Sequence, residues 1–211
     1  MFSSAASLPG GTLPKVQATD DRFVAIRLEQ VFSECFSRRW RTRLLGGASE
    51  PYYQPATDSH GMHLLYYRSD YFASALHEAA HWCIAGTARR RCDDFGYWYQ
   101  AGERSAELQR RFESVEVAPQ ALEWLFSRAC GRGFQLSVDN FAVDNRPPAP
   151  FAEAVLARLQ GWLASGALPT RAAQFAAALN RAATNSDPAL LFSPASYSLS
   201  ALLADVERGA P

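Results

Sequence analysis

The residues with the clearest chemical potential are the five from His77 to His81, which read HEAAH. On a helix, side chains at positions i and i+4 lie one above the other, so both imidazoles can reach one metal ion. Glu78 lies at the edge of the same face and is the candidate catalytic acid or base. A catalytic metal with open coordination positions needs a third protein ligand besides the two histidines.

Three downstream glutamates are candidates for that third ligand: Glu113, Glu116 and Glu123. Their spacings of three and seven residues place all three on one side of a helix. Glu116 is preferred because its neighbours Val115 and Val117 are apolar and suit a buried ligand. The spacing alone leaves the choice open.

Other readings of the same residues remain open. In a zinc hydrolase or peptidase, Glu78 acts as general base on a zinc-bound water. In a non-enzymatic binding module, four protein ligands enclose a structural metal. A second histidine pair, His60 and His63, lies in a loop or at a strand start and is expected at the surface, because Gly61 prevents a helical pairing.

The elements that must position these residues follow from hydrophobic spacing. We expect a helix over residues 71–85 that ends at Gly86 in the left-handed conformation. A second helix over residues 103–117 is expected to kink or restart at Pro119 and continue to residue 129. Short strands are predicted at residues 62–67 and 134–138, on either side of these helices.

The rest of the chain is also rich in helical patterns. A first helix is predicted from Asp20 or Asp21 to Trp40, with Phe23, Ile26, Val31 and Phe32 on its inner side. Gly46-Gly47 is expected to break the pattern, and residues 50–55 to be extended. After a proline-rich linker at residues 146–150, helices are predicted over residues 151–165, 170–181 and 198–206.

Length and composition bound the architecture. The 211 residues, 48% hydrophobic and 20% charged, fit one globular domain. We expect an α+β fold, predominantly α-helical with a few short strands, in which the HExxH helix forms the metal site. The predicted parts are a flexible tail (1–20), a catalytic metal-binding domain (21–185, with a helical cap from about 150) and a C-terminal helical extension (186–211).

The charge balance argues against two classes of partner. Lys+Arg and Asp+Glu both number 21, so the surplus of positive charge that nucleic-acid and membrane-surface binders need is absent. No run of 18 apolar residues predicts a membrane span, and the first residues do not look like a secretory signal. The four cysteines form no CxxC motif. We therefore expect a cytoplasmic protein that binds neither membrane nor nucleic acid directly.

Several blocks in order resemble the bacterial elongation factor P hydroxylase family. They are residues 77–86 with Ala88-Arg89-Arg90, residues 94–99 (DFGYWY), residues 112–117 (FESVEV), residues 119–126 (PQALEWLF), Asp139-Asn140 and residues 171–175 (RAAQF). The likeness covers roughly residues 22–180. A lone HExxH is shared with many metallopeptidases, whereas the ordered set of blocks is specific.

This resemblance implies an activity. Members of the family hydroxylate the modified lysine of translation elongation factor P after a β-lysyl group has been attached to it. Two histidines and a carboxylate are thought to hold their divalent metal, a role that maps here onto His77, His81 and Glu116. We accordingly expect a non-haem iron(II) hydroxylase with dioxygen as co-substrate, because such a ligand trio leaves coordination positions open.

The resemblance also directs attention to substrate contacts. A basic lysine arm should meet negative groups, so Asp94, Glu113 and Glu123 are predicted near the metal. Tyr97 is predicted as a wall of the pocket, because an aromatic ring can hold the alkyl stem of a long cationic side chain.

Overall fold

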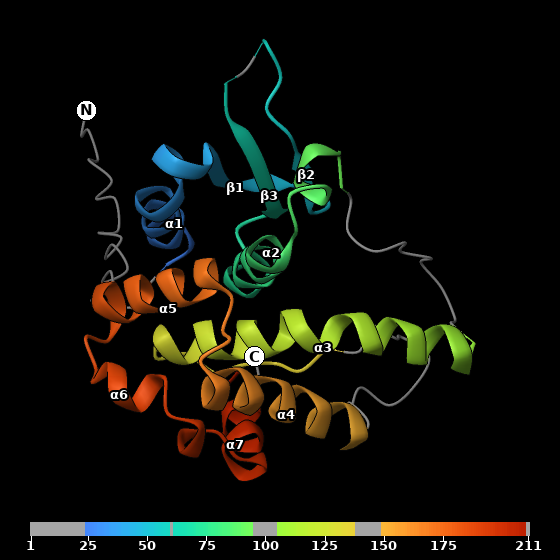
Figure 1. The fold of residues 1–211 in the computed structure, drawn as a ribbon, viewed down its shortest axis with the longest axis vertical. Coiled ribbons are helices and arrows are strands. Elements are labelled where there is room, and N and C mark those ends of the chain that lie inside the picture. Colours follow the sequence, from blue (N-terminus) through green and yellow to red (C-terminus); the bar gives the residue numbers. More distant parts are fainter. Residues whose placement is uncertain (1–23, 60, 95–104, 138–148, 210–211) are drawn as a thin grey trace, which may run out of the picture.

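A small sheet and the helices α1 (Ala25–Trp40) and α2 (Phe72–Ile84) lie at one end of the molecule, and the other helices form the rest (Figure 1). The computed structural model describes residues 24–59, 61–94, 105–137 and 149–209. In chain order the elements are α1 (Ala25–Trp40), β1 (Thr42–Ala48), β2 (Tyr52–Gln54), β3 (His63–Arg68), α2 (Phe72–Ile84), η1 (Arg89–Arg91), α3 (Ala106–Ala129), α4 (Ala149–Ser165), α5 (Thr170–Ala183), α6 (Pro188–Leu191), η2 (Pro194–Ser196) and α7 (Leu199–Gly209). The predominantly helical α+β fold is confirmed.

The sheet has the order β1-β3-β2, with β1 parallel and β2 antiparallel to β3. Alternate residues of its strands are buried, among them Leu44, Leu65 and Tyr67, because successive side chains of a strand point to opposite faces. Both α1 and α2 contact the sheet, and α2 lies between it and α3 (Figure 1). The predicted strand at residues 62–67 and the extended segment at 50–55 are confirmed as β3 and β2.

The strand β1 was not predicted, because Gly46-Gly47 was expected only to interrupt the preceding helix. The ladder with β3 outweighs the low strand propensity of glycine. Close packing also requires a glycine here: a Cβ at position 46 would lie 2.7 Å from both the Ser69 carbonyl oxygen and the Tyr67 hydroxyl.

The first helix begins later than predicted. Its N-cap is Val24, so the expected cap at Asp20 or Asp21 is wrong, and Phe23 lies outside the described residues. Ile26 is 66% exposed rather than on the inner side. The buried face is formed by Leu28, Val31, Phe32 and Phe36, a spacing of three to four residues that matches the helical period.

The helix α2 confirms the predicted helix over residues 71–85, but its predicted stop is wrong. Its C-cap is Ala85, with φ −54° and ψ 123°. The glycines with positive φ among the described residues are Gly47, Gly131 and Gly166, so Gly86 does not supply a left-handed cap. The carbonyl groups at this end of α2 therefore need another hydrogen-bond partner.

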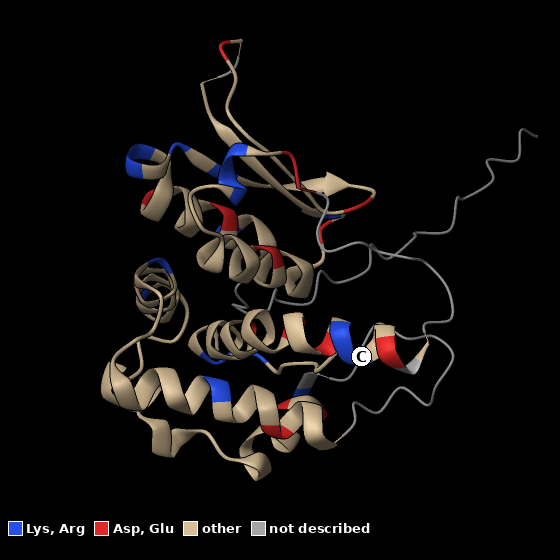
Figure 2. Ribbon diagram, turned by 45° about the vertical axis from the view of Figure 1, so that its right-hand side comes forward, with Lys and Arg blue, Asp and Glu red and all other residues tan. Residues whose placement is uncertain are grey.

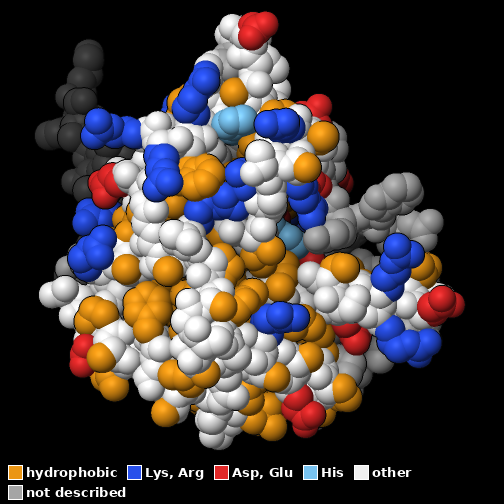
Figure 3. Space-filling view, in the orientation of Figure 1, with side chains coloured by type: hydrophobic (Ala, Val, Ile, Leu, Met, Phe, Trp, Pro, Cys, Tyr) orange, Lys and Arg blue, Asp and Glu red, His pale blue; other side chains and the backbone are white. Residues whose placement is uncertain are grey.

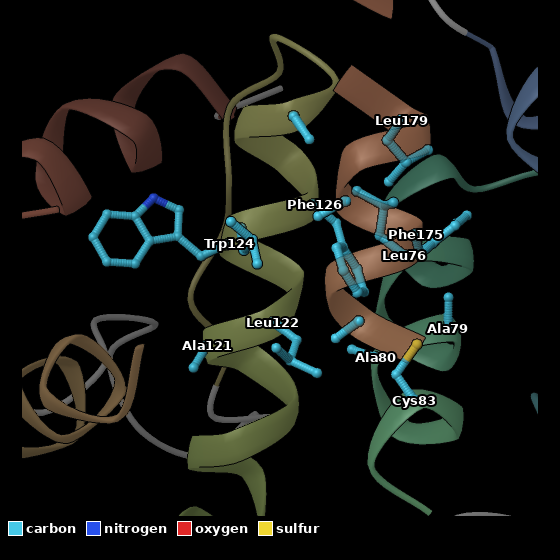
Figure 4. Close-up of a cluster of buried hydrophobic side chains, with 14 of the residues drawn as sticks. Leu76, Ala79, Ala80, Cys83, Ala121, Leu122, Trp124, Phe126, Phe175 and Leu179 are labelled. Atoms are coloured by element: carbon cyan, nitrogen blue, oxygen red, sulfur yellow. The ribbon is translucent and has the colours of Figure 1, made fainter. Parts of the chain in front are cut away.

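The helix α3 runs through Pro119 as one element of 24 residues, where a kink or restart was expected. Its second half is buried on all sides by α2, α4 and α5. Figure 4 shows Leu122 and Phe126 pointing toward α2 and α5, while Trp124 points to the opposite side. This packing stabilises a helix that proline alone would weaken by about 3 kcal/mol.

After α3, residues 134–137 have no regular structure, so the strand predicted at residues 134–138 is wrong over its described part. The backbone N–H of Phe134 instead donates to the carbonyl of Asp205 in α7. The buried Asp205 carboxylate also accepts hydrogen bonds from Trp124 Nε1 and Arg128 Nε, each at 2.7 Å. These contacts attach the last helix to the core.

The predicted helices at 151–165, 170–181 and 198–206 are confirmed as α4, α5 and α7, and the short α6 was not predicted. The predicted linker at residues 146–150 lies mostly outside the described residues. Positive and negative residues are found both on the sheet side and among the long helices (Figure 2). Among the described helices, none has the length and apolar character that crossing a bilayer requires.

Candidate metal centre

The two histidines of the HEAAH segment face each other near the end of α2. Their ring centroids are 4.6 Å apart, and His77 Nε2 lies 3.0 Å from His81 Nε2. The spacing of four residues on a helix places both rings on the side of α2 that faces α3. Their side chains are 26% and 18% exposed, so the pair is accessible at one edge.

A buried carboxylate from α3 completes the group. The two oxygens of Glu116 lie 3.5 Å from His77 Nε2 and 3.4 Å from His81 Nε2. Glu116 Oε2 is buried and has no hydrogen-bond partner. A buried charged oxygen without a partner is costly unless a cation is close by.

These three side chains fit a divalent metal ion. Within the described residues they form a group whose ligand atoms all lie within 4.8 Å of one another. Two atoms bound at about 2.1 Å to one ion, at angles between 90° and 110°, are about 3.0–3.4 Å apart. The observed separations of 3.0, 3.4 and 3.5 Å are close to this range. Of the three glutamates that the sequence left open, the structure brings Glu116 within 3.5 Å of the Nε2 atoms of both histidines.

Glu123 contacts the other ring nitrogen of His77, Nδ1. Its Oε2 lies 2.8 Å from His77 Nδ1, and the side chain is buried. A carboxylate at this nitrogen holds a proton on Nδ1, so the proton that a metal ion displaces is the one on Nε2, the nitrogen that faces Glu116. The separation of seven positions from Glu116 to Glu123 is about two helical turns, which lets one helix contact both ring nitrogens of His77.

The carboxylates around His77 stabilise a positive charge at this histidine. Burial alone lowers the pKa of His77, but the hydrogen bond to Glu123 and the charges of Glu123, Glu116 and Glu78 raise the pKa to about 10. For Glu116, burial raises the pKa, whereas the hydrogen bond from His81 and the charges of both histidines lower it to about 2. In the metal-free protein, the proton on His77 supplies the positive charge that the surrounding carboxylates stabilise. A bound metal cation can replace this proton.

A cavity opens beside His81, between α2, the sheet and η1. Glu78 lines it, and burial raises the pKa of this carboxylate. The other lining residues are Tyr53, Leu65, His81, Trp82, Ala85, Arg89, Arg90 and Asp94. Histidine side chains reach the surface on the face seen in Figure 3. Glu78 thus lies next to the two histidines and lines this cavity, whose free volume of about 30 Å³ is that of about one water molecule.

The predicted substrate contacts lie at different distances from this cavity. Asp94 lines the cavity and forms an ion pair with Arg89. Glu113 accepts a hydrogen bond from Gln109 Nε2 at 3.0 Å, one turn from Glu116, and Glu123 faces His77. Tyr97 lies outside the described residues.

Of the second histidine pair, the described member His63 does not join the group of His77, His81 and Glu116. His63 begins β3, and its Nδ1 accepts a hydrogen bond from the Ala56 N–H at 2.9 Å and lies 2.8 Å from the Tyr53 hydroxyl, while His60 lies outside the described residues. Sequence reasoning missed Tyr53 and Arg90 as cavity residues. Both are brought there by tertiary packing, and only the aromatic pair Tyr52-Tyr53 and the arginine run hinted at them.

Comparison with known proteins shows which family the chain resembles. A profile described as elongation factor P hydroxylase matches residues 31–190. The elongation factor P lysine hydroxylase of Haemophilus influenzae is 44% identical to the chain over 142 residues, which are 67% of this chain and 79% of that protein. The range matched by the profile contains α2 and α3, and with them the histidines and glutamates of the metal group.

Proposed function

The chain belongs to the elongation factor P hydroxylase family, and from this premise we propose that it hydroxylates the β-lysylated lysine of translation elongation factor P with the help of a bound metal ion. The family assignment makes the chain a lysine hydroxylase. The observation that carries the metal part of the proposal is the convergence of two imidazole nitrogens and a partnerless buried carboxylate oxygen.

In this proposal His77, His81 and Glu116 hold the ion, which we assign as iron(II). Three ligands that lie this close together occupy one side of an ion and leave the other side open. A bound iron(II) ion supplies the activation of dioxygen for oxidising a C–H bond, chemistry that no amino-acid side chain performs unaided. Glu123 fixes the orientation of the His77 ring, so that its Nε2 stays directed at Glu116.

The lysine arm is proposed to enter beside His81, where a cavity of about 240 Å³ lined by His81, Ile84 and Val115 adjoins the smaller one lined by Glu78. Trp82 and Tyr53 form the walls of the smaller cavity and can enclose the alkyl stem, while Glu78 and Asp94 are the acidic groups that face an ammonium. Asp94 is already paired with Arg89, so an incoming ammonium has to compete with that guanidinium. Glu78 has no such ion pair among the described residues and is the stronger candidate for a direct contact or a proton transfer.

The partner and the compartment follow from the same proposal. The substrate is a translation factor, so we place the protein in the cytoplasm. The protein substrate is recognised through its modified lysine rather than through nucleic acid. Dioxygen is the proposed co-substrate: one of its atoms enters the C–H bond, and a two-electron reductant converts the other to water.

The experiment that tests the function is mass spectrometry of β-lysylated elongation factor P after incubation with iron-loaded protein, dioxygen and an excess of ascorbate, which supplies the two electrons that reduce the second oxygen atom to water. We expect a gain of about 16 Da, the mass of one oxygen atom. The variant Glu116→Gln should abolish the gain, while Glu107→Gln, an exposed position on the same helix, should leave it unchanged. Product formation by Glu116→Gln at the wild-type rate would exclude the proposed ligand set.

A zinc hydrolase remains the competing reading of HEAAH, and the family match favours hydroxylation over it. Metal analysis of the purified protein, followed by parallel peptide-cleavage and hydroxylation assays, separates the two. Cleavage that requires zinc and is lost in Glu78→Gln would support the hydrolase.

A further inference from the structure

The end of the metal-binding helix is held by a side chain from a distant part of the chain. His81 lies in the last turn of α2, and the carbonyl groups after it lack intrahelical partners. No left-handed glycine closes this end, as shown above for Gly86. Arg171, in the first turn of α5, takes over that function.

Arg171 contacts the helix end in a specific way. Its Nη2 donates to the carbonyl oxygens of Trp82, Cys83 and Ala85 at 2.9, 3.1 and 2.6 Å. The guanidinium also lies over the rings of Trp40 and Trp82, at 4.8 and 4.7 Å from their centroids. Planar stacking combined with several directed N–H donors is possible for arginine and not for lysine.

The positive charge of Arg171 is compensated by the C-terminal end of α2. Among the described residues no carboxylate forms an ion pair with it, and a second arginine, Arg90, donates to the same Ala85 carbonyl. Burial and the nearby Arg90 lower the pKa of Arg171. The negative end of the helix dipole at the C-terminus of α2 compensates this positive charge.

We propose that Arg171 is a positioning residue, which keeps the last turn of the metal-binding helix formed and thereby holds His81 in place opposite Glu116. The inference rests on the proposed metal site. Trp82 directly follows His81 in the chain, so fraying that starts at the Trp82 and Cys83 carbonyls reaches the ligand at once. Arg171 belongs to the RAAQF block of the sequence, for which the hydroxylation chemistry itself gives no role.

The test is the affinity of the metal-free protein for cobalt(II), measured by competition with a chromophoric chelator, together with the visible spectrum of the cobalt(II) protein. We expect Arg171→Lys to weaken cobalt(II) binding about tenfold, the lower end of the range for a group hydrogen-bonded directly to a ligand, because Arg171 acts on His81 through the helix end, and to change the spectrum. The matched control is Arg128→Lys. Arg128 likewise lies over two rings, those of Trp124 and Tyr197, but it holds α7 and not α2.

The outcomes separate positioning from general stability. Both arginine variants should lower the unfolding temperature, but only Arg171→Lys should change cobalt(II) affinity and spectrum. Equal changes in both variants, or wild-type affinity in Arg171→Lys, would overturn the proposal. If Arg171→Lys fails to fold, Trp40→Leu removes one face of the stack and should show the same effect in weaker form; wild-type cobalt(II) binding by it would contradict the proposal.

The same titration shows separately whether the metal site itself is correct. His81→Ala should lose high-affinity cobalt(II) binding. If His81→Ala loses it while Arg171→Lys keeps it, only the positioning role fails. If both bind cobalt(II) as the wild type does, the metal site fails.

Discussion

Metal binding to this protein should release a proton from His77, and the amount can be worked out from the site. In the metal-free protein the pKa of His77 is raised to about 10, because the hydrogen bond and charge of Glu123 and the charges of Glu116 and Glu78 outweigh burial. At pH 8 a group with that pKa is about 99% protonated, whereas a histidine with the ordinary value of 6.5 is about 3% protonated. A metal ion needs the unprotonated ring, so binding at pH 8 should release about one proton from His77.

The sign of the pH dependence follows directly. Protons compete with the metal for His77 at every pH below about 10, so metal affinity should rise as the pH rises through the neutral range. With one proton displaced, the increase is about tenfold per pH unit, equivalent to about 1.4 kcal/mol.

The assay is isothermal titration calorimetry of metal-free protein with cobalt(II) at pH 8, repeated in buffers of different ionisation enthalpy. The slope of the apparent enthalpy against buffer enthalpy gives the number of protons released. The control is Glu123→Gln, which keeps the size of the side chain but removes the charge that acts on His77 Nδ1. We expect its proton release to be smaller by most of one proton. Equal proton release by the two proteins would show that Glu123 does not control His77.

Three further predictions concern other parts of the structure. Glu78→Gln should retain cobalt(II) affinity within about threefold but lower hydroxylation of elongation factor P, measured by mass spectrometry; a large loss of metal affinity would make Glu78 a ligand instead. Asp205→Ala should lower the free energy of unfolding by about 2–4 kcal/mol, because it leaves Trp124 Nε1 and Arg128 without their acceptor; urea denaturation measures this, and a loss below about 1 kcal/mol would contradict it. Gly46→Ala should cost about 1–3 kcal/mol in the same assay, since its Cβ would lie 2.7 Å from a backbone oxygen; unchanged stability would mean that the strand can shift.

Local pattern predicted most of the helical framework. The apolar positions of α2, α4 and α5 recur at the helical period, and this period depends only on the order of residues along the chain. The strand β1 and the unbroken course of α3 were missed for one reason. Each depends on neighbours that are distant in sequence: β3 for Gly46-Gly47, and the surrounding helices for Pro119.

The sequence by itself determined that two imidazoles lie one helical turn apart and that Glu78 lies at the edge of their face, because helix geometry converts a spacing in residues into a position in space. Tertiary structure decided which glutamate faces the histidines, since Glu113, Glu116 and Glu123 share one side of α3 and only the packing of α3 on α2 selects among them. It also decided that Arg171, 90 positions after His81 in the sequence, closes the helix on which His81 lies. Contacts of this kind have no local signal, because they depend on how helices meet and not on the period of any one helix.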